Sequence, residues 1–376
     1  MLSKILFITH ETSRTGAPFV LLHLIKWLKA NQPNIALSLL VLQRGDIHQD
    51  FTAVVDTIYE FEKKTNGLIN KVQKKVLGKS KTEDPKHKTL SAIAQNDYDV
   101  VYSNTIVAIP YGNKIKDFNS NVKHIVHIHE LSAIIKSMLP DFEIYDNGID
   151  HYIAASNLVK NNLIDNWNVE KSKVSRVYEC SEVSTQKIKS LPKSKFTVGA
   201  SGSVHWRKGS DLFLHVARYI KANHPEANIE FVWVGGISVA EKIIMDEDLR
   251  KTSLNNMVSF VGLKENPADY YNNFDVFLMT SREDPFPLVC IEVGMLAKPI
   301  ICFDNATGSQ EIIEEGGGFV VPYLSIEAMA EKVMLYYNDQ NQKEAHGNIN
   351  ATAFSKFTPQ QICPLYFEVI QKMINE

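Results

Sequence analysis

Short, β-branched apolar runs alternate with longer amphipathic runs, and this alternation occurs as two successive series along the 376-residue chain. The first series opens with KILFIT at residues 4–9 and PFVLLHLIKWLKAN at 18–31, and the second with FTVGASGSV at 196–204 and DLFLHVARYIKANHP at 211–225. Strands followed by amphipathic helices in this way are typical of parallel sheets covered by helices on both faces. The sequence therefore predicts an α/β protein with two doubly wound, Rossmann-like domains.

A polar segment with one proline, KIKSLPKSK at residues 187–195, separates the two series. We therefore predict an N-terminal domain over residues 1–190 and a C-terminal domain over residues 191–355. The last amphipathic stretch, residues 356–376, is expected to form a helix that packs back across the domain boundary. Ligands of open α/β sheets bind at the carboxyl ends of the strands, so two such domains facing each other predict an interdomain cleft.

Composition narrows the cellular setting. No apolar run reaches the roughly 18 residues that a membrane-spanning helix needs, and the apolar start of the chain is too short for an export signal. The four cysteines are scattered, without metal-ligand spacing. We expect a cytoplasmic protein with reduced cysteines and no nucleic-acid partner.

Lysines concentrate between Lys63 and Lys88, a run that holds nine of them against two acidic residues. One interpretation is a basic amphipathic helix on an anionic membrane surface, which would make the protein peripheral on the inner face of the cytoplasmic membrane. The alternative is a solvated loop, because lysine runs are usually exposed. The helical interpretation depends on four apolar residues at helical spacing: Leu68, Ile69, Val72 and Val76.

Glu292 stands in an otherwise apolar helical stripe. Its neighbours at helical spacing are Leu288, Val289, Met295 and Leu296. Burying a carboxylate without a partner in apolar surroundings costs roughly several kcal/mol, so a carboxylate at this position implies a hydrogen-bond partner. The sequence therefore marks Glu292 as a candidate ligand-binding residue.

Three strand-to-helix loops carry features of an anion site. Gly16 lies where the first loop enters a helix, and Arg207 and Lys208 directly precede the helix expected from residue 211. Pro287 suits the first turn of the helix that holds Glu292, which would leave the N–H groups of residues 288–290 free for a bound anion. With Asp284 before that helix start and Glu292 after it, two carboxylates can hold hydroxyl groups on either side of a phosphate. A sugar nucleotide has this arrangement of groups.

The D-x7-E arrangement of Asp284 and Glu292, followed by GMLAKPII, resembles the E-x7-E signature of retaining glycosyltransferases of family 4. SRTGAPFVLLHLIKWL is similar to that family's N-terminal glycine loop, YDVVYSNT to its acceptor-side strand and loop, and GSVHWRKGSDLFLHVA to its phosphate-binding loop. The resemblance covers nearly the whole chain. It implies the GT-B fold, in which an acceptor-side Rossmann-like domain faces a nucleotide-sugar-binding one.

The resemblance also implies roles for individual residues. Glu292 would hold the nucleotide ribose, Asp284 the hydroxyls of the donor sugar, and Lys208 the diphosphate. Gly16 would lie near the β-phosphate. The chain departs from the family at Asp284, where Glu is commoner, and at Ser203, where Arg is commoner, and we expect Arg207 to supply the missing cation. The remaining implied contacts are the donor-side backbone of Phe286, Pro287, Leu288 and Val289, and the acceptor-side residues His10, Arg14 and Asn104.

His129 ends the strand of VHIHE and, by resemblance, lies beside the reacting sugar. It completes the expected catalytic set of His129, Asp284, Arg207 and Lys208. His127 shares its strand face with His129, but the spacing supplies no third metal ligand. The D-x-D of Asp97 and Asp99 directly precedes a strand and is interpreted as a turn. We therefore expect no metal and no cofactor, with a sugar nucleotide of the UDP or GDP type as co-substrate.

The resulting hypothesis is a retaining, metal-independent glycosyltransferase. It would transfer a sugar from a nucleotide-diphosphate donor to a hydroxyl of a glycan or lipid-linked glycan in surface polysaccharide synthesis. Two alternatives remain open, namely a GT-B sugar-nucleotide epimerase and a non-catalytic two-domain protein that binds a nucleotide sugar.

Overall fold

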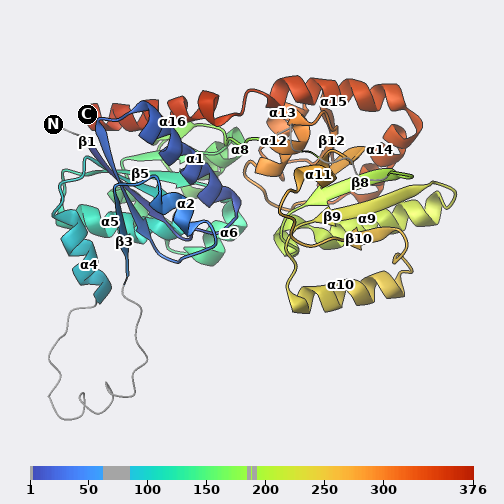
Figure 1. The fold of residues 1–376 in the computed structure, drawn as a ribbon, viewed down its shortest axis with the longest axis horizontal. Coiled ribbons are helices and arrows are strands. Elements are labelled where there is room, and N and C mark those ends of the chain that lie inside the picture. Colours follow the sequence, from blue (N-terminus) through green and yellow to red (C-terminus); the bar gives the residue numbers. More distant parts are fainter. Residues whose placement is uncertain (1–2, 62–84, 184–187, 189–192) are drawn as a thin grey trace, which may run out of the picture.

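A computed structural model describes residues 3–61, 85–183, 188 and 193–376. The chain forms two lobes, each built on its own parallel sheet, as Figure 1 shows. The predicted α/β architecture with two Rossmann-like sheets is confirmed. Most of the lysine run Lys63–Lys88 lies outside the described residues, so its interpretation stays a prediction. Among the residues that are described, no helix is long and apolar enough to cross a membrane.

The N-terminal lobe holds a seven-stranded sheet of order β3-β2-β1-β4-β5-β6-β7, with every strand parallel to its neighbours. The sequence favours this because the central strands carry near-continuous apolar runs, such as the buried ILFI of β1. The strands are β1 (Ser3–Thr9), β2 (Ile35–Val41), β3 (Thr57–Glu60), β4 (Val100–Asn104), β5 (Lys123–Ile128), β6 (His151–Ala154) and β7 (Val174–Arg176).

Helices cover both faces of this sheet. The apolar stripe of the first, which includes Leu21, Leu24 and Leu28, is buried in the core. Within the described residues, the α-helices of this lobe are α1 (Gly16–Asn31), α2 (His48–Thr52), α4 (Pro85–Ala94), α5 (Ile109–Phe118), α6 (Ser132–Met138), α7 (Phe142–Tyr145) and α8 (Asn157–Trp167).

The C-terminal lobe repeats the design on a six-stranded parallel sheet of order β10-β9-β8-β11-β12-β13. Its strands are β8 (Phe196–Ser201), β9 (Ile229–Val234), β10 (Val258–Phe260), β11 (Val276–Met279), β12 (Ile300–Phe303) and β13 (Gly318–Val321). Its helices are α9 (Ser210–Asn223), α10 (Val239–Lys251), α11 (Ala268–Tyr271), α12 (Leu288–Met295), α13 (Gln310–Ile313), α14 (Ile326–Asn338) and α15 (Gln340–Phe354).

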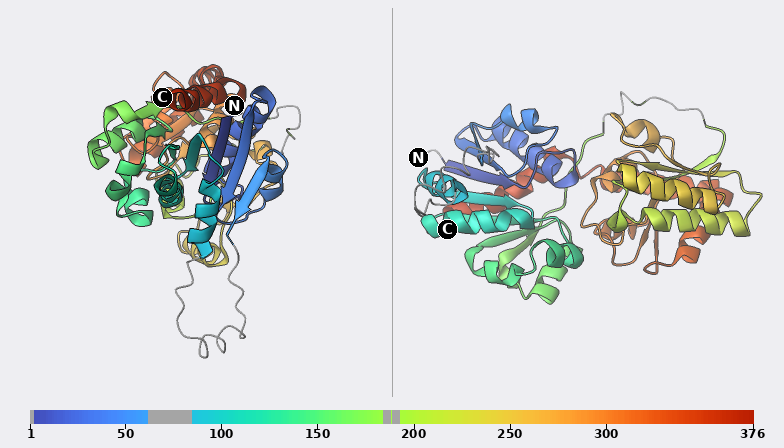
Figure 2. Two further views of the ribbon diagram at one scale, coloured as in Figure 1. Left: turned by 90° about the vertical axis from the view of Figure 1, so that its left-hand side faces the viewer. Right: turned by 90° about the horizontal axis from the view of Figure 1, so that it is seen from below.

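The last helix, α16 (Pro359–Asn375), returns to the N-terminal lobe and lies along it in all the views of Figures 1 and 2. It packs against α1, β4 and β5, where the ring of Phe367 lies 6.0 Å from that of Trp27. The Tyr366 hydroxyl donates to the Tyr178 carbonyl at 2.9 Å. The chain thus ties the two lobes together through its C-terminal end.

Strand order reverses direction at the same place in each lobe, between β1 and β4 in the first sheet and between β8 and β11 in the second. Loops that leave the carboxyl ends of such strands diverge and open a crevice. The loops β1–α1, β8–α9 and β11–α12 therefore start at the two switch points. These are the three loops in which the sequence places its anion-binding features.

Candidate active site between the two domains

A cleft of about 550 Å³ lies between the lobes and is lined by residues of both. Its walls come from the loops that follow β1 and β5 in the N-terminal domain and β8 and β11 in the C-terminal domain. Of the thirteen candidate site residues, only Asn104 does not line it. The other twelve are His10, Arg14, Gly16, His129, Arg207, Lys208, Asp284, Phe286, Pro287, Leu288, Val289 and Glu292.

The N-termini of α1 and α12 meet at this cleft. A Cβ placed on Gly16, the first residue of α1, would lie 4.0 Å from the Leu288 side chain at the start of α12. Both termini direct N–H groups towards one region, which favours an anion there. The glycine leaves this space open.

Two details of these helix starts differ from the sequence prediction. Pro287 is the residue before α12, in an extended conformation, and not part of its first turn. The Cys290 N–H already donates to the Pro287 carbonyl at 3.0 Å, which leaves the N–H groups of Leu288 and Val289 as the donors for an anion. Phe286 is buried against Tyr178, with ring centroids 4.7 Å apart, so only its backbone is available to a ligand.

The β8–α9 loop brings its two cations to the cleft through a tight turn at Gly209. This residue has φ +69°, and a Cβ would lie 1.9 Å from the Thr280 carbonyl oxygen at the end of β11, so only glycine fits. Lys208 Nζ lies 2.5 Å from Asp284 Oδ2, and Arg207 Nη1 lies 3.5 Å from Asp284 Oδ1. The two loops therefore form one charged unit.

Asp284 is only 5% exposed. Burial raises the pKa of its carboxyl, but Lys208 and Arg207 more than offset this and the pKa is lowered overall. The carboxylate is held ionised by two cations and the hydroxyl of Ser281, which donates at 3.1 Å. Asp284 thus holds Lys208 in place at the cleft. This role in positioning Lys208 was not predicted from the sequence.

Glu292 is half-buried in the cleft wall, where its Oε1 accepts a hydrogen bond from Ser181 Oγ at 2.8 Å. Ser181 belongs to the segment that leaves the N-terminal lobe, so this bond joins the two lobes. Burial raises the pKa of Glu292 to about 7, and the Ser181 hydrogen bond only partly opposes the shift. The ionised carboxylate is therefore under-stabilised in this structure and would gain from hydroxyl donors of a ligand.

His129 lies in the opposite wall with both ring nitrogens bonded to protein. Its Nδ1 lies 2.8 Å from Glu179 Oε1, and its Nε2 lies 2.8 Å from Asn104 Oδ1. Asn104 Nδ2 donates to the Ala17 carbonyl at 3.0 Å, which fixes the amide so that its oxygen faces His129. Because both partners of His129 are acceptors, both ring nitrogens carry protons and the ring is an imidazolium.

The pKa of His129 agrees with this assignment. Burial lowers it, but the Glu179 carboxylate more than compensates, and the net shift is upward. The ion pair therefore stabilises the fold fully below the ordinary histidine pKa, and this contribution is lost as the pH rises through the raised pKa. Below this raised pKa, His129 supplies a positive charge to the cleft.

Asn104 was expected to contact the acceptor. It is fully buried, and both ends of its amide are bonded to protein, so it stands behind the wall and positions His129 and the start of α1. His10 and Arg14 do reach the cleft. His10 Nδ1 lies 3.4 Å from Thr105 Oγ1, while the half-exposed Arg14 pairs with Asp46 at 3.2 Å.

A third group joins His127 of β5 and His129, the residue after the strand's last residue. His127, His129 and Glu179 each place a ligand-type atom within 4.8 Å of the others, and His127 Nε2 is buried without a hydrogen-bond partner among the described residues. The carboxylate that sequence spacing did not supply is thus present. However, His129 Nδ1 and Glu179 Oε1 are at hydrogen-bond distance, shorter than the roughly 3.3 Å between two ligands of a tetrahedral Zn²⁺ at about 2.0 Å each. The geometry favours an ion pair over a metal site.

Asp97 and Asp99 lie away from the cleft. Asp99 Oδ2 accepts from the Lys4 N–H at 2.7 Å near the amino-terminal ends of β1 and β4, and Asp97 has φ +50°. Their place at a turn agrees with the interpretation made from the sequence.

Three acidic residues of the cleft were missed by the sequence reasoning. Glu179 follows β7 and reaches His129 from a different strand, so no local spacing reveals it. Glu130 adjoins His129, and its Oε2 accepts the His129 N–H at 2.9 Å. Glu283 adjoins Asp284, and its Oε1 accepts the Ala133 N–H at 3.1 Å across the cleft. Glu130 and Glu283 could have been found from the sequence, because each is the direct neighbour of a predicted site residue.

The Glu179→Gln variant should lower the pKa of His129, because the nearby negative charge that raises it is lost. The measurement is an NMR titration of the His129 Cε1–H signal. Glu182→Gln, a change in the same segment that does not touch His129, serves as the control. A His129 pKa that is equal in both variants would refute the assignment of a charged ring.

Comparison with known proteins connects this geometry to a family. Residues 183–353 match the family described as glycosyl transferases group 1. CapM, a capsular polysaccharide biosynthesis glycosyltransferase of Staphylococcus aureus, is 26% identical over 233 residues, which cover 60% of this chain and 59% of CapM. AmsD, an amylovoran biosynthesis glycosyltransferase of Erwinia amylovora, is 38% identical over 87 residues, 23% of this chain and 24% of AmsD. The chain thus matches less than two thirds of the length of either relative.

Among solved structures, HepE of Anabaena in complex with UDP and glucose superposes with a TM-score of 0.79 at 17% identity, over 98% of this chain and all of the other. At that identity the likeness shows the fold, which is GT-B. Residues 183–353 of this chain are thus similar to the glycosyl transferases group 1, and both lobes together have the GT-B fold.

Proposed function

We propose that this chain transfers a sugar from a nucleotide-diphosphate donor to a hydroxyl-bearing acceptor, with retention of the anomeric configuration and without a metal. The observation that carries the proposal is the convergence of two helix N-termini, the cations Arg207 and Lys208, and the under-stabilised Glu292 carboxylate on one cleft. Diphosphate, ribose and sugar are the groups that such a set can bind together. HepE, which has the same fold, was solved with UDP and glucose, and this supports a donor of the UDP type over GDP.

The donor would lie along the C-terminal wall. Lys208 and Arg207, with the N–H groups of Leu288 and Val289, would bind the diphosphate, while Glu292 accepts hydrogen bonds from the ribose hydroxyls. Asp284 holds Lys208 in place and lies next to the position of the sugar. Gly16 leaves room for the β-phosphate between the two helix ends.

The chemistry follows from the charges around the scissile bond. As the bond between the anomeric carbon and the phosphate oxygen breaks, the diphosphate gains negative charge, which Lys208, Arg207 and the imidazolium of His129 stabilise. The acceptor hydroxyl attacks from the face that the diphosphate leaves, and its proton passes to the departing phosphate oxygen. The carboxylates nearest to His129, Glu179 and Glu130, are held in hydrogen bonds, so neither is offered as a nucleophile.

The acceptor would enter from the N-terminal wall, near His10 and Arg14. CapM and AmsD are named for polysaccharide biosynthesis, and this supports a glycan or lipid-linked glycan as the acceptor. If the lysine run Lys63–Lys88 binds an anionic membrane surface, the lipid-linked form is favoured.

Stereochemistry and metal dependence test the proposal together. Donor turnover followed by ¹H NMR should first give a product with the anomeric configuration of the donor, and EDTA should change the rate by less than about twofold, a barrier change well under 1 kcal/mol. An inverted first product would contradict retention. Loss of activity in EDTA with recovery on adding Mn²⁺ would contradict the metal-independent mechanism. Turnover to an epimer without transfer would favour the epimerase.

A further inference from the structure

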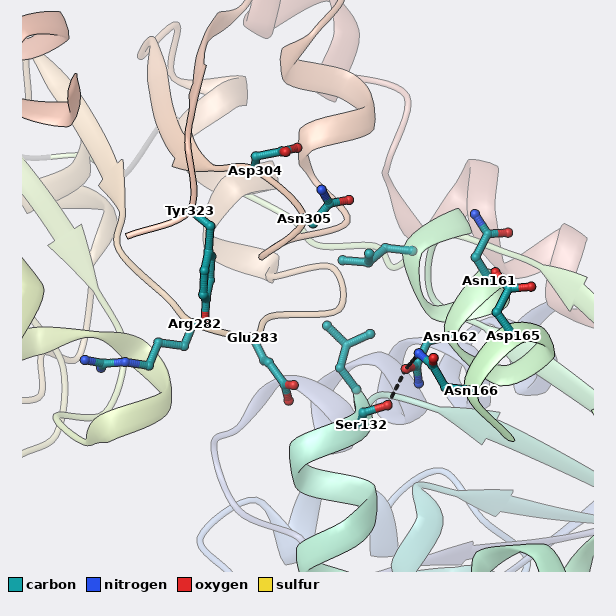
Figure 3. A pocket seen from close by; sticks show the side chains of 12 residues that line it. Ser132, Asn161, Asn162, Asp165, Asn166, Arg282, Glu283, Asp304, Asn305 and Tyr323 are labelled. Carbon is teal, nitrogen blue, oxygen red and sulfur yellow. Dashed lines mark hydrogen bonds between the residues drawn. The ribbon is translucent and has the colours of Figure 1, made fainter. Parts of the chain in front are cut away.

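A second cavity, of about 680 Å³, opens beside the first and is also shared between the lobes. Its N-terminal side is formed by the start of α6 and by α8, and its C-terminal side by the loops after β11, β12 and β13, as Figure 3 shows. Leu131 and Glu283 line both cavities. A molecule in the second cavity could therefore reach the reaction site at Glu283.

Two buried polar atoms in this lining have no hydrogen-bond partner among the described residues. Asn162 is 7% exposed, and its Oδ1 accepts from Ser132 Oγ at 2.5 Å and from Asn166 Nδ2 at 2.9 Å, which leaves Nδ2 unpaired. Glu283 Oε1 is bonded to the Ala133 N–H, and its Oε2 is unpaired. A buried donor or acceptor without a partner is destabilising, so these two atoms indicate a ligand that both accepts and donates hydrogen bonds.

The charge of the cavity selects the class of ligand. Its one lining cation is Arg282, and this guanidinium is bonded to both carboxylate oxygens of Asp211, at 3.0 and 2.7 Å. In Figure 3 the Arg282 side chain points away from the cavity. The lining is acidic because it also includes Asp165, Glu283 and Asp304. An acidic lining disfavours binding of a phosphate or a carboxylate.

The remaining lining groups suit a polyhydroxylated molecule. Asn161 and Asn305 are exposed in the lining, and Tyr323 is 51% exposed. An aromatic ring gives an apolar surface for the C–H face of a sugar, while amides and carboxylates exchange hydrogen bonds with its hydroxyls. The lining thus differs from that of the first cavity, where cations and helix N-termini select a diphosphate.

We propose that this second cavity binds a neutral sugar residue of the acceptor, next to the residue that receives the transferred sugar. The inference rests on the proposed glycosyl transfer and assigns the acceptor a place between α8 and the β11–α12 loop. Asn162 would donate to a sugar hydroxyl, Glu283 would accept from one at the junction of the two cavities, and Tyr323 would cover the ring.

Saturation-transfer NMR with neutral disaccharides, namely maltose, cellobiose and lactose, tests the site on the full chain in the presence and absence of UDP. At least one of the three should receive saturation from the wild-type protein, and glucose 6-phosphate should receive less. Asn162→Asp keeps the acceptor oxygen and loses the donor, and Tyr323→Ala removes the ring at an exposed position. Each should reduce the signal at least fivefold. Asn348→Asp, the same chemical change at an exposed position on α15, should leave it unchanged.

Two results would overturn the proposed sugar site. No saturation of any of the three disaccharides by the wild-type protein, or a stronger signal for glucose 6-phosphate, would overturn the proposal. A signal that persists in both cavity variants would place the sugar elsewhere and also overturn it. A thermal shift with UDP, measured in parallel on every variant, reports on the nucleotide site separately. If UDP did not stabilise the wild-type protein, that result would count against glycosyl transfer. Binding of a sugar in the second cavity would still be supported if the disaccharide signal depended on Asn162 and Tyr323.

Discussion

Replacing Glu292 with Gln should raise the melting temperature of the nucleotide-free protein at pH 8 by a few degrees while it weakens nucleotide binding. Burial raises the pKa of Glu292 to about 7, so at pH 8 the native state carries an ionised carboxylate that it stabilises poorly. A shift from 4.5 to about 7 corresponds to roughly 3 kcal/mol at 1.36 kcal/mol per unit. The neutral amide removes this cost and can still accept from Ser181. Differential scanning calorimetry of both proteins without ligand gives the comparison.

The pH dependence of this difference has a defined sign. A carboxyl with a raised native pKa destabilises the fold progressively as the pH rises from the unfolded to the native value. The two proteins should therefore have similar stability near pH 4.5 and diverge up to about pH 7, with the variant more stable. Glu331→Gln, at an exposed site on α14, is the control and should show no such divergence. A variant that is less stable than the wild type at pH 8 would mean that Glu292 is satisfied within the protein.

Replacing Lys208 with Met should lower kcat by about 10²–10³-fold, the usual effect of removing one preorganised group that stabilises developing negative charge. It should also destabilise the protein by about 3–5 kcal/mol, because Asp284 is buried and loses its nearest counter-ion. Steady-state kinetics and thermal unfolding measure the two effects on the same preparation.

The double variant Lys208→Met with Asp284→Asn separates these two roles. It removes the uncompensated carboxylate, so most of the lost stability should return while kcat stays low. Recovery of activity along with stability would show that Lys208 serves only to neutralise Asp284. Arg207→Ala is the matched test of the second cation and should weaken nucleotide affinity. If it left affinity unchanged while the Lys208 variant lost it, Arg207 would not be the substitute for the cation missing at Ser203.

The fold could be predicted because its signals are local. Buried strands and amphipathic helices each carry their own periodicity, and two such series in succession define two parallel sheets. The anion-binding loops could be placed for the same reason. A glycine or a pair of cations just before a helix predicts an anion site from a short stretch of sequence. Gly16, Lys208 and Glu292 meet at one cleft because all three follow strands at a switch point.

The residues that were missed or misplaced depend on which elements become neighbours. Glu179 follows β7 and pairs with His129, which follows β5. No local sequence pattern shows that β6 lies between these two strands in the sheet. Asn104 ends a strand at the correct edge of the sheet, but the sequence does not say whether its side chain points into the cleft or behind it. Its burial follows from the position of the Ala17 carbonyl and His129 on either side of the amide. The second cavity, which the sequence did not predict, likewise combines residues from α6, α8 and three C-terminal loops.

Calorimetric titration of UDP, GDP and ADP into the wild-type protein and into Glu292→Gln tests most directly the claim that a nucleotide binds between the two lobes. UDP should bind to the wild-type protein with one site per chain, and its affinity should fall at least tenfold in the variant, about 1.4 kcal/mol. If none of the three nucleotides bound, or if UDP bound both proteins equally, the cleft would not be the nucleotide site.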